Sequence, residues 1–388
     1  MKLKQKKIAF IYYTHEPKKN CLETMAFALS TIVSLAKMGW QVDLFLWEKP
    51  SLYYESLLPN NVNIKYFHDL RRRFTLVRLI WLPFQFQWRK NYHCVFGVGQ
   101  IAAHIANIMA ISNKCPFIYF NDEFPSFWGT NLWTNPWYIL EQKTAKNIAM
   151  IVVPDPNRFL PLCRELDVSK KKYAFLPNIP IIKTSFEKIN WHKKLGIPKD
   201  SIPFLYAGYL GDFMQIPEIL SSLPYWNERA VLVIHNKSHD VMEKYRKELS
   251  HLDIAGKVFW SNKPLSETDL NSLVSYVAGN FALYRNTGPN MEYIGFSSGK
   301  LMRSLACGTP VIASQLPSLS FVKDYEVGVL VNHPCEIPTA IQAIIDNRDA
   351  YSKRCLDFVQ TEVSFDKYWH KFCDQLKEEI NINLRKPV

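Results

Sequence analysis

Residues 295–313 constrain the fold of this chain more than any other stretch. They read as a small flexible loop, a short helix, a glycine, a proline and an apolar strand. Ser297 or Ser298 can cap the helix, because a hydroxyl accepts hydrogen bonds from the amides of the first turn. Gly308 suits the left-handed position after a helix, and Pro310 prevents the helix from continuing. The stretch therefore predicts a helix that leads directly into a buried strand.

Two cations stand in the first turns of this helix, where the macrodipole is positive. Lys300 and Arg303 each cost roughly 0.3–1 kcal/mol there, whereas an acidic residue is favourable. A helix that begins with serines, a glycine and two cations is suited to bind an anion. The alternative is that both cations point into solvent and the helix only packs on a sheet. The residues alone leave these two interpretations open.

The same stretch resembles the nucleotide-sugar loop of GT-B glycosyltransferases, in particular the family-4-like group of bacterial surface-polysaccharide enzymes. In that group a loop, a helix and the motif Ala-x-Gly-x-Pro-Val-Ile-Ala hold the diphosphate and the ribose of the donor. The chain matches the motif at residues 306–313, and it has a Ser-Ser-Gly-Lys variant of the loop at residues 297–300. We therefore expect the donor diphosphate to be held by Ser297, Ser298, Gly299, Lys300 and Arg303.

The chain departs from the family at both glutamates of its Glu-seven-residues-Glu motif, where Gly295 and Arg303 stand. In the family the second glutamate usually binds the ribose, and the first usually lies near the transferred sugar. Their loss leaves the donor contacts and the catalytic assignment open. It also supports an alternative function, a degenerate GT-B protein that binds a ligand or partner without turnover. A sugar-nucleotide epimerase of the same fold is less favoured, because its catalytic acids and histidines have no obvious match.

The composition is that of a globular protein with a strong positive charge. The chain has 388 residues, 48% of them hydrophobic and 21% charged, which suits two folded domains. Its net charge of +12 suits nucleoside diphosphates, anionic lipid or nucleic acid as partners. Nucleic acid is the weakest of these, because no RNA- or DNA-binding signature is present. Eight scattered cysteines without a Cys-x-x-Cys pair indicate a reducing compartment and no zinc site.

The N-terminal residues predict a strand, a helix and a second strand. An apolar strand at 7–13 precedes a helix over about 21–38, and residues 42–46 form the next strand. This order implies a parallel sheet, in which ligands bind beyond the carboxyl ends of the strands. The loop at 14–16 is thus a candidate wall for the acceptor, with His15 as a candidate catalytic residue. No Gly-x-Gly-x-x-Gly follows the first strand, which argues against an NAD enzyme.

Two acidic residues follow a later strand of the same predicted sheet. Asp122 and Glu123 come directly after the strand at 116–120. At the carboxyl end of a strand they are well placed to position the acceptor or to act as a base, so both are candidate catalytic residues. The alternative is structural, with Asp122 or Ser126 as the cap of the next helix.

Residues 70–92 combine arginines and lysines with leucine, isoleucine, phenylalanine and tryptophan. This mixture is expected of a segment at a membrane interface, and its alternative is a buried helix with a solvated basic end. The resemblance favours membrane contact, since related enzymes often take lipid-linked acceptors from the inner leaflet. No apolar run is long enough for a membrane-spanning helix or a signal peptide. We therefore expect a cytoplasmic protein that is peripheral on an anionic inner membrane face.

Residues 200–380 repeat the strand and helix pattern, and the resemblance to the family is strongest there. The turn after the strand at 204–207 lies against the donor phosphates in the family. The segment at 258–264 resembles the strand and turn that contact the nucleotide base, and a further strand at 281–285 precedes the central loop. The candidate donor contacts in these segments are Gly208, Tyr209, Gly211, Ser261, Asn262 and Arg285.

The predicted architecture is an α/β fold of the GT-B kind, with two Rossmann-like domains whose parallel sheets face a central cleft. We expect an N-terminal acceptor domain at 1–182 and a C-terminal nucleotide-sugar domain at 183–363. A final helix within 364–388 is expected to cross back to the first domain. The lysine-rich, proline-bounded residues 181–201 are predicted to link the two domains.

The favoured function is transfer of a sugar from a nucleoside diphosphate sugar to a hydroxyl of a glycan or lipid-linked acceptor. A leaving diphosphate develops negative charge, which backbone amides and fixed cations stabilise best in a water-poor site. No Asp-x-Asp motif is present, so we expect chemistry without a metal, and no cofactor beside the donor substrate. The family implies that the configuration of the sugar is retained.

Overall fold

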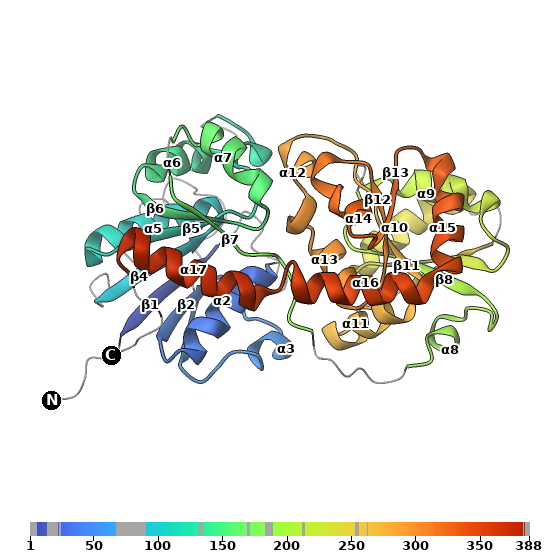
Figure 1. The fold of residues 1–388 in the computed structure, drawn as a ribbon, viewed down its shortest axis with the longest axis horizontal. Coiled ribbons are helices and arrows are strands. Elements are labelled where there is room, and N and C mark those ends of the chain that lie inside the picture. The colour runs from blue at the N-terminus through green and yellow to red at the C-terminus, as the bar shows by residue number, and fades with distance from the viewer. Residues whose placement is uncertain are drawn as a thin grey trace. The chain divides into compact units, whose positions relative to one another are not determined.

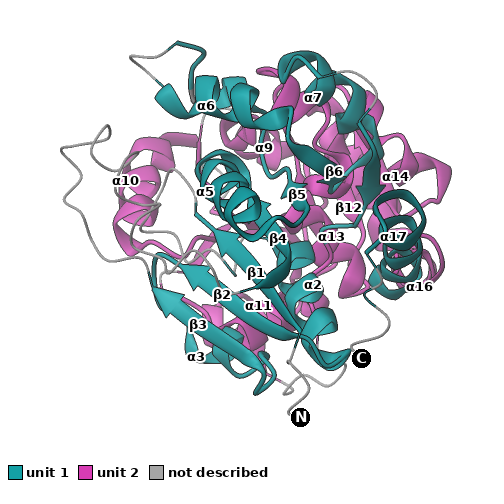
Figure 2. Ribbon diagram, turned by 90° about the vertical axis from the view of Figure 1, so that its left-hand side faces the viewer, with its two compact units in different colours: residues 1–178, 365–388 teal, residues 179–364 magenta. Residues whose placement is uncertain are grey.

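The computed structural model shows two compact units, each built on a parallel sheet (Figure 1). Unit 1 comprises residues 1–178 and 365–388, and unit 2 comprises residues 179–364 (Figure 2). The structure describes residues 6–13, 22, 25–66, 91–131, 135–168, 171–182, 189–211, 214–252, 256–261, 263–382 and 384.

In the described part of unit 1, seven parallel strands follow the order β3-β2-β1-β4-β5-β6-β7. Their bounds are β1 Lys7–Tyr12, β2 Gln41–Leu46, β3 Val62–Tyr66, β4 Tyr92–Val98, β5 Phe117–Phe120, β6 Ile148–Val153 and β7 Tyr173–Phe175. The central strands are almost continuous apolar runs that are buried along their length. Such runs are typical of a parallel sheet covered by helices on both faces.

The helices of unit 1 cover both faces of this sheet. Those in the described part of the unit are α2 Ala26–Lys37, α3 Leu52–Glu55, α5 Gly99–Asn113, α6 Pro136–Ala145, α7 Phe159–Glu165 and α17 Phe365–Ile380. From β1 to β2 the chain moves across the sheet in one direction, and from β4 to β5 it moves in the other. Right-handed crossovers then place α2 and α5 on opposite faces, as Figure 2 shows.

In the described part of unit 2, six parallel strands follow the order β10-β9-β8-β11-β12-β13. Their bounds are β8 Ile202–Ala207, β9 Ala230–His235, β10 Val258–Ser261, β11 Gly279–Ala282, β12 Val311–Ser314 and β13 Gly328–Val331. The helices are α8 Trp191–Leu195, α9 Ile216–Ser222, α10 His239–Leu249, α11 Glu267–Tyr276, α12 Pro289–Glu292, α13 Gly299–Ala306, α14 Phe321–Asp324, α15 Ile337–Asp346 and α16 Arg348–Thr361.

Each sheet has one point at which the strand order changes direction. In unit 1 this point lies between β1 and β4, and in unit 2 it lies between β8 and β11. The helices on either side of such a point lie on opposite faces, so the loops beyond the carboxyl ends of the two strands diverge. The topology therefore marks one candidate ligand position in each unit.

The last helix of the chain returns to the first unit, as predicted. Figure 1 shows α17, in red, beside the blue and green elements of unit 1. Trp369, Phe372 and Leu376 of α17 are buried, and the Phe372 ring lies 6.5 Å from the ring of Phe120 on β5. An amphipathic helix made after unit 2 thus supplies part of the core of unit 1.

Two predictions of local structure need correction. Residues 181–201 are not only a linker, because α8 forms within them and buries Trp191 in a core cluster of unit 2. The strand predicted at 281–285 ends at Ala282, because the Tyr284 amide donates to the Ser314 hydroxyl at 2.7 Å instead of continuing the sheet. Neither contact is visible in local sequence patterns.

The segment predicted to contact a membrane lies almost wholly outside the described residues. Only its last two residues are described, and Tyr92 begins β4. Among the helices that the structure describes, none is long and apolar enough to cross a membrane. The loop with His15 also lies outside the described residues.

Candidate functional site

Helix α13 begins at a sequence-predicted cap. The Ser298 hydroxyl oxygen accepts a hydrogen bond from the Leu301 amide at 3.2 Å, and the same hydroxyl is hydrogen-bonded to that of Tyr284. The predicted cap is confirmed at Ser298, whereas Ser297 ends the preceding 3-10 turn and Gly299 is the first helical residue. Because Tyr284 follows β11, these bonds fix the start of α13 beside the switch point of unit 2.

The amine of Lys300 is buried in this corner. Its Nζ lies 4.3 Å from the centre of the Tyr206 ring and 5.1 Å from the centre of the Tyr284 ring. Among the described residues it has no hydrogen-bond partner. Burial lowers the pKa of Lys300 from 10.5 to about 7. The two rings offer cation–π attraction, but no acid of the described residues pairs with this buried lysine, as one normally would.

The turn after β8 passes beside Lys300. The Gly208 amide donates to the His235 carbonyl at 3.1 Å, and the Asn236 side chain donates to the Gly208 carbonyl at 2.7 Å. Gly208 has a φ of +143°, and a Cβ at this position would lie 3.7 Å from Cδ of Lys300. The left-handed backbone favours glycine here and brings the main chain next to the lysine.

The other two candidates in this turn contact each other. The Tyr209 carbonyl accepts a hydrogen bond from the Tyr206 hydroxyl, and the Tyr209 side chain is 56% exposed. Its ring fills the space that a Cβ at Gly211 would need, at 2.2 Å from Cε1. Gly211 therefore allows Tyr209 to fold over the turn, and the ring is accessible to a ligand.

Arg303, the second predicted cation, has a carboxylate partner. Its guanidinium lies 2.7 Å from Glu267 of α11 and donates to the Asn271 side chain at 2.5 Å. Lys237 also lies 3.1 Å from Glu267. Although burial raises the pKa of Glu267, Arg303 and Lys237 lower it more, and the net shift is downward. Arg303 is thus neutralised by the protein, in contrast to Lys300.

The remaining candidates of unit 2 lie at the ends of other strands. The Ser261 hydroxyl is hydrogen-bonded to Nδ1 of His235 at 3.0 Å, and burial lowers the pKa of that histidine to about 4. Arg285 forms an ion pair with Glu218 of α9 and is more than half exposed. Asn262 lies outside the described residues. The structure brings Gly208 and Ser298 together with Lys300, whereas Arg285 is engaged elsewhere.

In unit 1, Asp122 lies beside the switch point between β1 and β4. Its Oδ1 accepts a hydrogen bond from the Glu123 amide at 2.8 Å. Its two carboxylate oxygens lie 3.0 and 3.2 Å from the position of a Cβ on Gly99, which follows β4 with a φ of +80°. Glycine thus allows both the turn and the approach of the carboxylate. Burial raises the pKa of Asp122, while two backbone amides and the charge of Arg158 oppose that shift.

The alternative that Asp122 or Ser126 caps the next helix is wrong. The next helical turn, Pro125–Trp128, has no side-chain cap, and neither does α6. The Ser126 amide instead donates to Glu165. Asp122 is therefore not a helix cap.

A buried polar network surrounds Asp122, and it was not predicted from the sequence. Arg158 is 1% exposed, donates to the Asn121 side chain at 3.3 Å and donates to the Asp122 carbonyl at 3.1 Å. The hydroxyl of Tyr119 donates to Glu141, a wholly buried acid. Burial raises the pKa of Glu141 to about 8. One signal was present, since polar residues follow the apolar strand β5 directly and follow β6 after a single proline.

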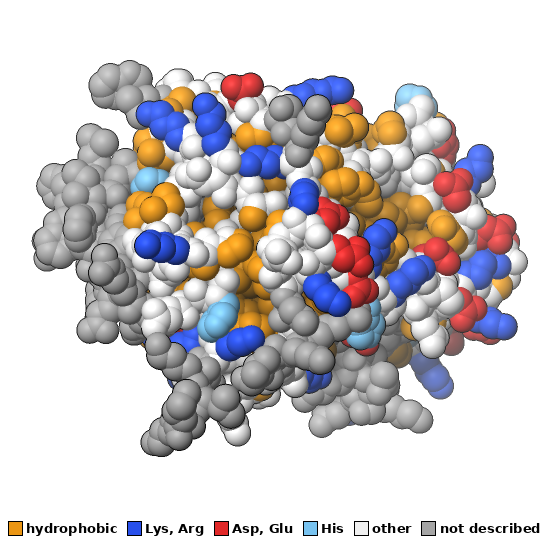
Figure 3. Space-filling model, turned by 60° about the vertical axis from the view of Figure 1, so that its left-hand side comes forward, with side chains coloured by type: hydrophobic (Ala, Val, Ile, Leu, Met, Phe, Trp, Pro, Cys, Tyr) orange, Lys and Arg blue, Asp and Glu red, His pale blue; other side chains and the backbone are white. Residues whose placement is uncertain are grey.

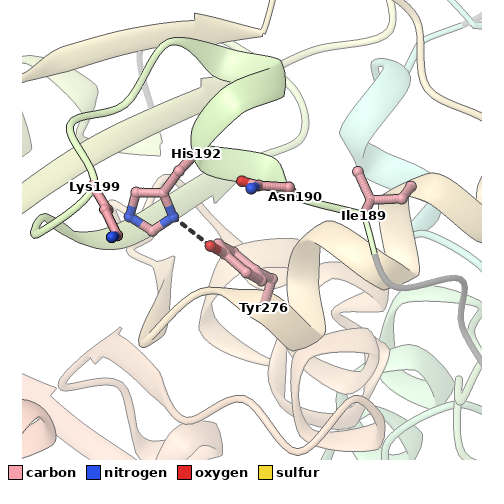
Figure 4. Close-up of a pocket in the computed structure, with 5 residues that line it drawn as sticks. All are labelled: Ile189, Asn190, His192, Lys199 and Tyr276. Carbon is pink, nitrogen blue, oxygen red and sulfur yellow. Dashed lines mark hydrogen bonds between the residues drawn. The ribbon is translucent and has the colours of Figure 1, made fainter.

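A pocket of about 450 Å³ lies elsewhere in unit 2. Figure 4 shows the side chains of His192 and Tyr276 pointing toward each other within it, with Lys199 beside them. Lys199 precedes β8 and Tyr276 ends the helix before β11, so the pocket lies at the amino edge of the sheet. It is not part of the site around Lys300, which lies at the carboxyl edge.

The positive charge of the chain does not gather in one patch on the face shown in Figure 3, where described Lys and Arg side chains lie scattered among acidic and apolar ones. The structure offers no group of three or more His, Cys, Asp or Glu side chains for a metal ion in the part of the chain that it describes. Neither observation identifies a ligand. The buried amine of Lys300 is therefore the strongest local indication of a ligand-binding site.

No family model and no curated protein sequence matches the chain. Solved structures do. HepE (Alr3699) of Anabaena in complex with UDP-glucose superposes with a TM-score of 0.72 at 12% identity, covering 96% of this chain and 99% of that one. Sucrose-phosphate synthase from Thermosynechococcus elongatus gives 0.72 at 15% identity, covering 97% and 99%.

WaaG, a glycosyltransferase involved in lipopolysaccharide biosynthesis, gives a TM-score of 0.64 at 12% identity, covering 96% of this chain and 100% of its own. The similarity extends over nearly the whole length of each protein. At these identities it concerns the fold alone. With two parallel α/β units and a last helix that returns to the first of them, this chain has the GT-B fold.

Proposed function

We propose that this chain is a glycosyltransferase that moves a sugar from a nucleoside diphosphate sugar to a hydroxyl of a glycan or lipid-linked acceptor. The observation that carries this proposal is the buried amine of Lys300, which lies at the switch point of unit 2 without an acceptor group among the described residues. The fold supports it, because solved structures of the same fold hold UDP or UDP-glucose.

In the proposed reaction the bond between the anomeric carbon and the diphosphate breaks, a bond from the acceptor oxygen to that carbon forms, and the acceptor hydroxyl gives its proton to a base. The departing diphosphate takes the electron pair and gains negative charge. A charged Lys300 and the amides at the start of α13 meet that charge in a buried corner, where electrostatic interactions are strong. Ser298 holds these amides in place, and Ser297, Gly299, Gly208 and Tyr209 complete the proposed donor contacts.

On the acceptor side we assign positioning or base work to Asp122 and Glu123. Asp122 lies at the switch point of the unit 1 sheet, and burial favours its protonated form, so it can accept a proton more readily than an exposed aspartate. We expect the transfer to retain the configuration of the sugar and to need no metal, as the sequence resemblance implies.

One observation favours the second candidate function, ligand binding without turnover. Where the resemblance leads us to expect a glutamate, the chain has Arg303, and this arginine is already paired with Glu267. A site that has exchanged an acid for a neutralised cation can still bind a nucleotide and yet lack a catalytic contact.

An assay of purified protein with a panel of UDP-, GDP-, ADP-, CDP- and dTDP-sugars separates these functions. A transferase releases the nucleoside diphosphate from at least one donor, faster when membrane lipid extract is added as acceptor, and Lys300→Met slows that release. Binding without release identifies the degenerate protein, and conversion of the sugar with the nucleotide still attached identifies an epimerase. If no nucleotide-sugar binds, the proposal is wrong.

We also propose that the acceptor is reached at the anionic inner face of a membrane, through residues 70–92. A basic residue near such a surface contributes roughly 1 kcal/mol, and salt screens it, while inserted aromatic side chains resist salt. The protein should co-sediment with anionic vesicles and much less with neutral ones. Replacing Arg71, Arg72 and Arg73 by glutamate should remove most of this preference.

The matched control places the same charge change on the exposed helix α10, at Lys244, Arg246 and Lys247. This triple variant should bind anionic vesicles nearly as well as the unchanged protein. Equal binding to anionic and neutral vesicles, or equal losses in the two triple variants, would contradict membrane contact through residues 70–92.

A further inference from the structure

Among the described residues, no carboxylate or carbonyl accepts a hydrogen bond from the Lys300 amine. Tyr206 on β8 and Tyr284 after β11 present their rings to Nζ. Their hydroxyls are engaged with the Tyr209 carbonyl and the Ser298 hydroxyl. Burial raises the pKa of both phenols, that of Tyr284 to about 12, so neither is a phenolate near neutral pH. The amine thus lies among neutral groups.

The elements packed against α13 add no counter-charge, as far as the chain is described. Glu267 on α11 is bound by Arg303 and Lys237, and Arg348 on α16 donates to backbone carbonyls. The strands β11 and β12 and the 3-10 turn before α13 carry no titratable side chain. Burial is the cause that shifts the proton equilibrium of this amine, and no charged group in the described part of the chain offsets it.

We propose that the donor diphosphate and a proton bind together at this site. In the ligand-free protein the Lys300 amine is largely uncharged above neutral pH, and it takes one proton from solvent when a diphosphate enters the corner. This inference rests on the proposed function, because the diphosphate is the anion that it requires. A bound anion supplies the acceptor that the buried ammonium lacks, so each stabilises the other.

The coupling makes donor affinity depend on pH in a defined direction. A ligand that binds only the protonated form loses affinity as that form becomes rare. With a ligand-free pKa of about 7, affinity should fall about fivefold between pH 7 and pH 8. Product release is coupled to proton release in the same way. When the nucleoside diphosphate departs, the Lys300 amine returns its proton to solvent.

Titration calorimetry of the full chain in buffers of different ionisation enthalpy measures the proton directly. UDP, GDP, ADP, CDP and dTDP are the probes, at pH 7.5–8.5, above the second phosphate ionisation near 6. We expect uptake of about 0.9 proton per bound nucleotide at pH 8, given the ligand-free pKa of about 7. Lys300→Met should bind more weakly and take up none. Lys323→Met, on the exposed side of α14, should behave as the unchanged protein.

The outcomes separate this inference from the proposed function. Binding of a nucleotide with no proton uptake overturns the inference and leaves the function standing. No binding by any of the nucleotides overturns both. A ligand-independent measurement guards against a poorly folded variant: in protein labelled with ¹³C-lysine, the Lys300 Cε resonance of the unchanged chain should titrate near pH 7. Titration near pH 10 would overturn the inference whatever the calorimetry shows.

Discussion

Arg158 in unit 1 and Lys300 in unit 2 both bury a basic group at the carboxyl edge of a parallel sheet, yet their surroundings differ. Arg158 lies 4.7 Å from the Phe124 ring centre, donates to Asn121 and Asp122, and feels the charges of Asp122, Asp155 and Glu123. Lys300 has two aromatic rings and, among the described residues, no acceptor. The cation in unit 1 thus has acceptors and acids around it, whereas the described residues of unit 2 offer Lys300 none.

The largest expected effect of a substitution is a loss of transfer rate at Asp122, which tests the role of the unit 1 edge. If the edge of unit 1 serves the acceptor, Asp122→Asn should lower the rate of transfer about 10²–10⁴-fold, the range for a positioned acid or base. The amide keeps the Oδ1 that accepts from the Glu123 amide, so the fold and nucleotide affinity should be retained. Transfer rates, calorimetry and thermal unfolding of the variant check this.

Glu123→Gln is the matched variant, because it removes the adjacent negative charge and leaves the Asp122 carboxylate beside Gly99 in place. We expect a smaller loss of transfer rate than for Asp122→Asn. Parallel losses of stability and rate in Asp122→Asn would instead assign the aspartate a structural role.

Substitution of Arg158 should show that the stability of unit 1 depends on this buried cation. Arg158→Leu leaves the acids around it without their buried partner, which costs about 3–5 kcal/mol of unfolding free energy. Arg164→Leu, an exposed change in α7 at the other end of that short helix, should cost within about 0.5 kcal/mol. Urea unfolding of both variants measures the difference, and similar midpoints would show that the network contributes little.

Lys300 should behave in the opposite way. Lys300→Met should weaken nucleotide binding by about 1–3 kcal/mol, the range for a charge-assisted hydrogen bond. It should also raise the unfolding free energy at neutral pH, because a buried amine without an acceptor is removed. A variant that loses affinity and stability together would show that Lys300 holds the fold rather than a ligand.

The effect of Lys300 on the unfolding free energy should depend on pH in a defined direction. The pKa of Lys300 falls from 10.5 in the unfolded chain to about 7 in the folded one, so between these values the unfolded state binds more protons. The contribution of this lysine to stability therefore rises with pH across that window. Unfolding at pH 7, 8 and 9 should show a steeper rise for the unchanged protein than for Lys300→Met.

The smallest expected effect concerns the cap that holds α13. Ser298→Ala removes the hydroxyl that accepts from the Leu301 amide, at a cost of about 1 kcal/mol. Ser320 stands at the same position of α14 but makes no such bond, so Ser320→Ala should cost much less. Thermal unfolding compares the two. Equal shifts would mean that the cap at Ser298 is not what fixes α13.

The sequence allowed the parts of the site that depend on near neighbours to be predicted. A cap at Ser297 or Ser298 was expected because the amides that such a cap accepts from lie within the next three residues. Gly308 was expected to be left-handed because it follows a short helix. The order of apolar strands and helices likewise predicts parallel sheets, since each strand carries its own pattern.

The partners of the charged residues could not be predicted. Arg303 was expected to face an anion, but its partner Glu267 comes from another helix, 36 residues earlier in the chain. The rings around Lys300 come from β8 and from the residues after β11, two strands that become neighbours only at the switch point. Such pairs depend on the order of strands in the sheet, and a single sequence does not state that order.

The return of α17 to unit 1 has a consequence for how the chain is synthesised. Trp369, Phe372 and Leu376 complete the core of unit 1, but the ribosome reaches them only after all of unit 2. At about 5–20 residues per second, residues 179–364 take roughly 10–40 s. During that interval β7 and α2 lack the helix that covers them, while unit 2 can close its core from contiguous residues. The domain made first is thus the last to be finished, and its uncovered apolar face is the stretch of nascent chain that a chaperone would need to shield.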